Sequence, residues 1–139
     1  MADRYRILGQ LGQVAAASAA TLYTVPVPAA VTVGTGPTEV EVAPKVVSIH
    51  FQTLVTSIIV CNMDASVVAK FSITISDASD PVVTTNLFLN TELAIGNTSV
   101  CALGLTLSAG DSLKVSCSGA DCDFTAVGIE TTTGRGPNV

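Results

Sequence analysis

The chain has 139 residues, of which 48% are hydrophobic and only 12% are charged. This length suits one domain with a single core. The charged fraction is about half of the roughly 25% of residues that are charged in a typical globular domain. With six basic residues and a net charge of −5, the chain lacks the basic patch that a nucleic-acid surface needs. So low a charge is typical of a surface that other subunits cover, or simply of a Thr/Ser-rich β-protein.

The first twenty residues predict an extended arm in front of the folded domain. The opening MADRYRILGQ has no apolar h-region, so it is not expected to be a secretory signal. No apolar run reaches the roughly 18 residues that span a bilayer. Residues 15–20 are small but lack the amphipathic stripe of a stable helix. We therefore expect residues 1–20 to become ordered only through contacts outside their own domain.

The first predicted strand covers residues 21–25, and the prolines that follow end it because proline lacks a ladder donor. Residues 27–45 come next, with glycines and prolines around the alternating segment TEVEV. This pattern predicts a hairpin-type excursion.

Residues 46–61, VVSIHFQTLVTSIIVC, make up most of the longest run without charge, glycine or proline. Its many β-branched residues favour a pleated strand. The apolar–polar phase slips at 52–53, which predicts a bulge or a break there. From 54 to 61 nearly every residue is apolar or Thr/Ser, as in a strand that is covered on both faces. We interpret this run as the central strand region.

The rest of the chain predicts strands bounded by turn residues at 67–76, 82–89, 99–107, 113–117 and 122–130. A polar tail follows at 131–139. About eight antiparallel strands without a convincing helix are typical of a β-sandwich or jelly roll. The predicted organisation is therefore an N-terminal arm, an all-β domain over 21–130 and a C-terminal tail.

The sequence predicts no catalytic or metal chemistry. His50 is the one histidine, too few for a metal cluster, and no nucleophile has an activating context. We interpret it as a surface or interface residue. Two carboxylate pairs stand in or beside turns, where aspartate commonly serves backbone hydrogen bonds: Asp77 with Asp80, and Asp121 with Asp123. No enzyme activity, metal or cofactor is therefore expected.

Cys117 and Cys122 form the most specific local pattern. Both are expected on the inward faces of strands joined by a four-residue turn, which would place them opposite each other. Their separation could then suit a disulfide, formed after release of the protein from the cell. The alternative is two buried free thiols in contact, the default in a reducing cytosol.

Several short segments, in this order, resemble small all-β virion proteins encoded by tailed bacteriophages. The segments are LGQ at 8–10 (or 11–13), TLYTVP at 21–26, TSIIVCN at 56–62, GLTLSAGDSLKV at 104–115 and FTAVGIE at 124–130. Proteins of this type are similar to capsid decoration (cement) proteins and to tail or neck components. In the family a short connection joins TLYTVP to the IVCN strand, so residues 27–45 are a departure from its pattern.

The resemblance implies a non-enzymatic structural protein of the virion that is made in the host cytoplasm. A decoration subunit on the outer surface of the head is favoured over a tail, neck or baseplate component or a receptor-binding domain. The implied partners are the major capsid protein or other virion proteins, and further copies of the chain, with a trimer favoured; neither nucleic acid nor a membrane is implied. We expect the arm and the inserted hairpin to make the contacts, through Arg4, Tyr5, Arg6, Leu8, Gln10, Glu39, Val40, Glu41 and Val42.

Overall fold

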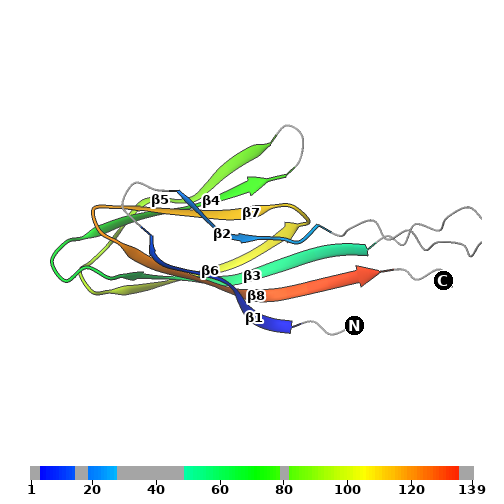
Figure 1. Ribbon diagram of the computed structural model, residues 1–139, viewed down its shortest axis with the longest axis horizontal. Helices are drawn as coiled ribbons and strands as arrows, with labels where there is room; N and C mark the ends of the chain where they lie inside the picture. Colours follow the sequence, from blue (N-terminus) through cyan, green and yellow to red (C-terminus); the bar gives the residue numbers. More distant parts are fainter. Residues whose placement is uncertain (1–3, 15–18, 28–48, 79–81, 135–139) are drawn as a thin grey trace, which may run out of the picture.

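The computed structural model describes residues 4–14, 19–27, 49–78 and 82–134 (Figure 1). All regular elements in these ranges are β-strands, so the all-β prediction is confirmed. None of the described residues forms a helix that is long and apolar enough to cross a membrane. The strands are β1 (Arg4–Val14), β2 (Ala20–Thr24), β3 (Ile49–Asn62), β4 (Ala69–Asp77), β5 (Val83–Leu93), β6 (Thr98–Ser108), β7 (Ser112–Ser118) and β8 (Cys122–Gly134).

The strands form two antiparallel four-stranded sheets that pack face to face (Figure 1). Sheet A has the order β1-β8-β3-β6 and sheet B the order β2-β7-β4-β5. The pairs β1–β8, β2–β7, β3–β6 and β4–β5 are those of one long hairpin that has been rolled into two layers. This topology is the eight-stranded jelly roll.

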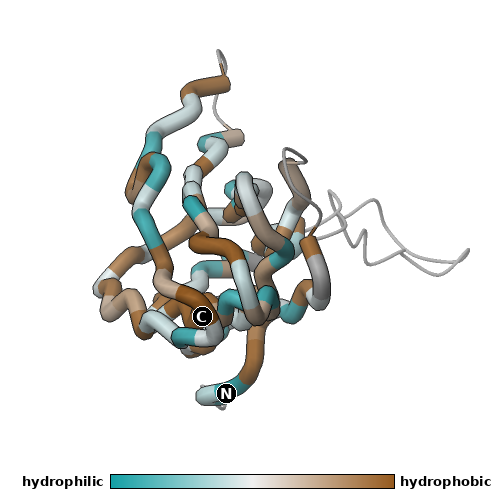
Figure 2. The backbone as a smooth tube through the Cα atoms, turned by 90° about the vertical axis from the view of Figure 1, so that its left-hand side faces the viewer, coloured by the Kyte–Doolittle hydropathy of each residue, from teal (hydrophilic) through white to brown (hydrophobic). Residues whose placement is uncertain are grey.

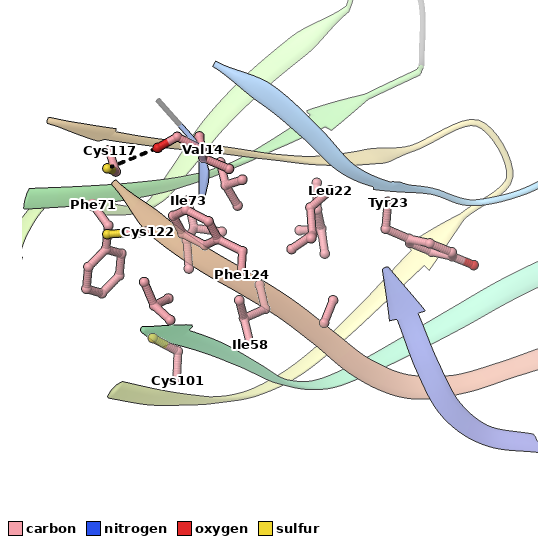
Figure 3. Close-up of a cluster of buried hydrophobic side chains, with 14 of the residues drawn as sticks. Val14, Leu22, Tyr23, Ile58, Phe71, Ile73, Cys101, Cys117, Cys122 and Phe124 are labelled. Carbon is pink, nitrogen blue, oxygen red and sulfur yellow. Dashed lines mark hydrogen bonds between the residues drawn. The ribbon is translucent and has the colours of Figure 1, made fainter. Parts of the chain in front are cut away.

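The core lies between the sheets because buried and more exposed residues alternate along most strands. Figure 2 shows the hydrophobic and hydrophilic parts of the backbone. In β7, for example, Leu113, Val115 and Cys117 are buried while Lys114 is exposed. The largest fully buried side chains are Phe71 and Phe124 (Figure 3). Burying each such side chain contributes about 1.5–3 kcal/mol to stability.

The central strand β3 lies between β8 and β6, where the sequence places it. It is unbroken and its register is regular at 52–53, so the bulge or break predicted there is wrong. The irregularity lies instead between Val55 and Ser57, in the register with both neighbours. The phase slip in the sequence has a different cause, because Thr53 is a buried polar residue, 1% exposed, that bonds to the opposite sheet.

The N-terminal segment is extended, but residues 4–14 belong to the domain and are not a separate arm. β1 pairs with β8 from Arg4, opposite Glu130, to Val14, opposite Cys122. The predicted boundary at residue 21 therefore separates strands that belong to one sandwich, and the prediction that this segment becomes ordered only through outside contacts stays a prediction. β8 likewise runs to Gly134, into the predicted tail. Of the predicted inserted hairpin, 27–45, all but the first residue lies outside the described residues.

Two of the segments that resemble phage virion proteins contain residues that connect loops and strand ends by hydrogen bonds. In the AGD turn between β6 and β7, the carboxylate of Asp111 accepts hydrogen bonds from the amides of Ser108 and Ala78, each at 2.9 Å. The amide of Gly110, whose φ is +88°, donates to the carbonyl of Val25 at 3.0 Å. The turn therefore ties together the ends of β2, β4 and β6.

Asn62, the last residue of IVCN, does the same at the opposite end of the sandwich. Its side-chain amide donates to the carbonyls of Val67 at 2.9 Å and Leu93 at 3.2 Å, and its oxygen accepts from the amide of Asp64 at 2.9 Å. Because the side chain is 2% exposed and fully bonded, it joins the β3–β4 loop to the β5–β6 turn at little desolvation cost.

Gly9 of LGQ allows the edge strands β1 and β2 to approach each other. A methyl group at Gly9 would overlap the carbonyl oxygen of Leu22. We expect Gly9→Ala to lower the free energy of unfolding by about 1–3 kcal/mol, the usual cost of overpacking. Gly104→Ala is the control, because no atom lies within 4 Å of a methyl group there. Urea denaturation of both variants measures the difference, and equal stabilities would contradict the tight β1–β2 contact.

Candidate functional site

The outer faces of the two sheets differ in chemistry. On the outer face of sheet B, the side chains that the register brings together are almost all polar. The apolar exception is Leu89, which is exposed beside a bulge in β5. The polar residues are Thr21, Thr24, Lys70, Ser72, Thr74, Ser76, Thr84, Asn86, Glu92, Ser112, Lys114, Ser116 and Ser118. This face is suited to water.

The outer face of sheet A is largely apolar. Its rows run across all four strands and consist of Tyr5, Ile129, Leu54 and Thr106; then Ile7, Val127, Ser57 and Ala102; then Gln10, Thr125, Ile59 and Val100. No charge occurs in these rows, and the register places Asp123 beyond them, at one end. We call these twelve residues the sheet A outer face.

Several of these apolar side chains are well exposed. The exposed fractions are 65% for Tyr5, 54% for Ile7 and 64% for Val100. Scattered apolar residues are ordinary on a surface, but a contiguous patch marks an interaction site. The sheet A outer face is therefore the candidate functional surface.

The sequence contained one signal for this surface. Residues 54–61 of β3 are typical of a strand that is covered on both faces, yet the described residues cover only the inner face. The apolar residues on the other face, such as Leu54 and Ile59, are those that the described part of the chain leaves uncovered. The sequence reasoning missed Ile7 and Val100 because it considered each strand alone.

Of the predicted contact residues, Tyr5 and Gln10 lie on the sheet A outer face. Arg4 is exposed, and Arg6 forms an ion pair with Glu130 at 3.2 Å between Nε and Oε2. Leu8 was predicted to make contacts with other subunits, but it is 9% exposed and packs in the core of this domain. Glu39, Val40, Glu41 and Val42 lie outside the described residues.

A polar cluster closes the sandwich beside this surface. The hydroxyl of Tyr23 in sheet B donates to Oε1 of Glu130 at 2.7 Å and lies 2.9 Å from Oγ1 of Thr53, both in sheet A. Burial, more than any other factor, raises the pKa of Tyr23 from 10.0 to about 12. A neutral phenol with two partners links the sheets, so the cluster has a structural role.

Cys117 and Cys122 lie at the other end of the core from Tyr23 (Figure 3). They belong to β7 and β8, which are in different sheets, so they face each other across the interior and not across a hairpin. Both are buried free thiols. Burial and a hydrogen bond with Cys117 raise the pKa of Cys122. The disulfide between them stays a prediction.

The described residues contain no group of three or more His, Cys, Asp or Glu side chains that could hold a metal ion. His50 is exposed on β3 and pairs in register with Thr133.

The two tyrosines of the chain give a matched pair of variants. We expect Tyr23→Phe to lower the free energy of unfolding by about 2 kcal/mol, because Thr53 and Glu130 lose a partner. Tyr5→Phe should change it by less than about 0.5 kcal/mol, because Tyr5 is 65% exposed.

The same pair tests the pH dependence. A phenol whose pKa is raised in the folded state stabilises the fold fully below pH 10 and loses that contribution as the pH rises toward 12. Tyr23→Phe should therefore lose less stability over this range than the unchanged chain, measured by denaturation at each pH. Parallel pH profiles would contradict the buried neutral phenol.

Thiol labelling tests the placement of the cysteines. Cys61 is half-buried, whereas Cys101, Cys117 and Cys122 are buried and burial raises the pKa of Cys101 and Cys122. Because the thiolate is the reactive form, we expect an aromatic disulfide reagent to modify Cys61 first and the others only after unfolding. Cys61→Ser should abolish the fast phase; rapid modification of Cys122 in the folded chain would contradict the structure.

Comparison with known proteins supports the fold. No family model and no curated protein matches the sequence. Among solved structures, the chain is similar to one in the crystal structure of the T13 viral particle of infectious bursal disease virus. That match has 11% identity and a TM-score of 0.50, and it covers 94% of this chain. A structure of the Gx strain of this virus matches with 12% identity and a TM-score of 0.50, over 98% of this chain.

The chain spans about a third of the length of these viral chains, 30% and 33% respectively. At such identities the likeness shows a shared β-sandwich fold. The solved structures that it resembles are thus those of virus particles.

Proposed function

We propose that this chain is a non-enzymatic structural protein of a tailed-phage virion, a capsid decoration (cement) subunit that binds the outer surface of the head and stabilises the shell. The sheet A outer face is the observation that carries the proposal. It is apolar and uncharged, and the described residues leave it bare. A face of this kind gains free energy when a neighbour removes it from water.

The contrast between the two faces favours a subunit that lies on a surface. Sheet A would face the shell, and the polar outer face of sheet B would face solvent. Few charges stand on the contact side, so few ions would have to be desolvated. A tail or neck component enclosed by neighbours on several sides would need a second apolar face.

Because a shell offers many copies of the binding site, each contact between the chain and the shell can be weak. Once one contact has formed, the next is effectively intramolecular, so the overall avidity exceeds the affinity of one contact. The jelly roll shared with chains of virus particles and the resemblance to phage virion proteins support this role. The major capsid protein is the proposed partner.

Incorporation into particles tests the proposal. We expect Ile7→Lys, on the sheet A outer face, to reduce the number of copies retained by purified particles about tenfold or more, since a loss of about 1.4 kcal/mol changes binding tenfold. Ile7 is 54% exposed, so the variant should still fold. Quantitative mass spectrometry of the particles measures the copy number.

Thr24→Lys is the matched control, because it adds the same charge to an exposed position of sheet B. It should be retained like the unchanged chain. Equal retention of both variants, or absence of the unchanged chain from particles, would contradict the proposed role of sheet A.

A further inference from the structure

Three of the four edge strands carry features that prevent pairing with another strand. β1 has Arg4 and Arg6 and two register shifts. β2 has only five residues, and Pro26 follows it closely. β5 has two register shifts, Asn90 at a φ of 48° and a charge at Glu92. Short length, charges, proline and bulges are the usual protections of an exposed edge.

β6, the remaining edge, has none of the charges or prolines. Its eleven residues, TSVCALGLTLS, extend for about 36 Å at about 3.3 Å per residue. It has one register shift, where Leu103 and Gly104 lie opposite Thr56 of β3, and sheet A is also irregular at this level between β3 and β8 and between β8 and β1. Within the described part of the chain, β6 pairs with β3 alone.

The core beside this edge is not completely covered. Leu93, Cys101 and Leu107 are buried on the β5–β6 side. Other apolar residues there are only partly buried: Leu87, Phe88, Leu103 and Leu105. An added strand beside β6 would cover part of this apolar surface as well as satisfy the free backbone groups.

We propose that β6 pairs antiparallel with β6 of a second copy of this chain about a two-fold axis. The register that overlaps all eleven residues is centred on Leu103. In it, Val100 lies opposite Thr106 of the other copy, and Ala102 opposite Gly104. Each pair joins residues of the same face, so Leu103 and Leu105 of both copies stay on the core side.

The strand itself indicates that its partner is a second copy. Each chain carries a net charge of −5, so two copies repel each other. A contact through β6 adds no further like charges, because this edge is uncharged. The outward residues of β6 are small, so the same residues of two copies can lie close together. They are Thr98, Val100, Ala102, Gly104, Thr106 and Ser108. A surface that complements itself makes the isologous contact of a two-fold dimer.

Pairing in this way joins two copies of sheet A into one eight-stranded sheet. The sheet A outer face then continues across both subunits, because β6 forms its border. The inference stands apart from the proposed function: dimers can form whether or not the chain belongs to a virion, and a virion subunit can exist without this contact.

Sedimentation equilibrium of charge variants tests the pairing and its register. The unchanged chain should have twice the 14.1 kDa of one chain. Val100→Lys with Thr106→Lys places like charges opposite each other and should weaken the dimer at least tenfold. Val100→Lys with Thr106→Glu places opposite charges across the axis and should restore it. Within one chain the two positions are six residues apart on the same strand, so they do not pair with each other.

Thr84→Lys, on the exposed part of the β5 edge, is the control and should leave the dimer unchanged. Circular dichroism confirms that each variant is folded. The inference is overturned by a monomeric unchanged chain, by a trimer, which would need two different edges in contact, or by a Lys/Lys variant that stays dimeric. A Lys/Glu variant as weak as the Lys/Lys variant would overturn the register.

Discussion

The structure depends on the position of β3 at the centre of sheet A, with hydrogen-bonded neighbours on both sides and the core on one face only. Its inward residues Val55, Ile58 and Val60 are fully buried. Its outward residues include Leu54 and Ile59, which is unusual for a face in water. Outward residues of β8, β1 and β6 continue this largely apolar surface, while the described residues cover the inner face alone. We propose that a neighbouring subunit covers this second face.

Other features of the fold hold this face in place. Asp111 and Asn62 join loops at opposite ends of the sandwich, and Tyr23 joins the two sheets beside Glu130. All are bonded within the domain, and no buried side-chain N or O atom among the described residues lacks a partner. The two outer faces therefore differ, one largely apolar and one polar, which suits the proposed role in assembly. The viral chains that the protein resembles support its β-sandwich fold.

Much of the fold could be predicted because the strands of sheet B and the later strands of sheet A alternate cleanly and end at turn residues. β1 could not, because Gly9, Gly12 and two register shifts obscure its period, and only β8 shows which side is inward. Thr53 obscures the pattern of β3 because its hydroxyl is polar in the sequence but buried in the fold, where its partner is 30 residues away. The candidate surface was missed for a related reason: Ile7, Leu54 and Val100 become neighbours only through the register of four strands that are distant in sequence.

The central claim is that the sheet A outer face is buried when the protein is assembled. A cryo-electron microscopy map of intact particles that contain this chain, at a resolution that separates strands, tests it most directly. The account predicts that Tyr5, Ile7, Leu54 and Val100 contact a neighbouring subunit, while Lys70 and Lys114 of sheet B face solvent. A map in which the outer face of sheet A is open to solvent and sheet B makes the contacts would contradict it.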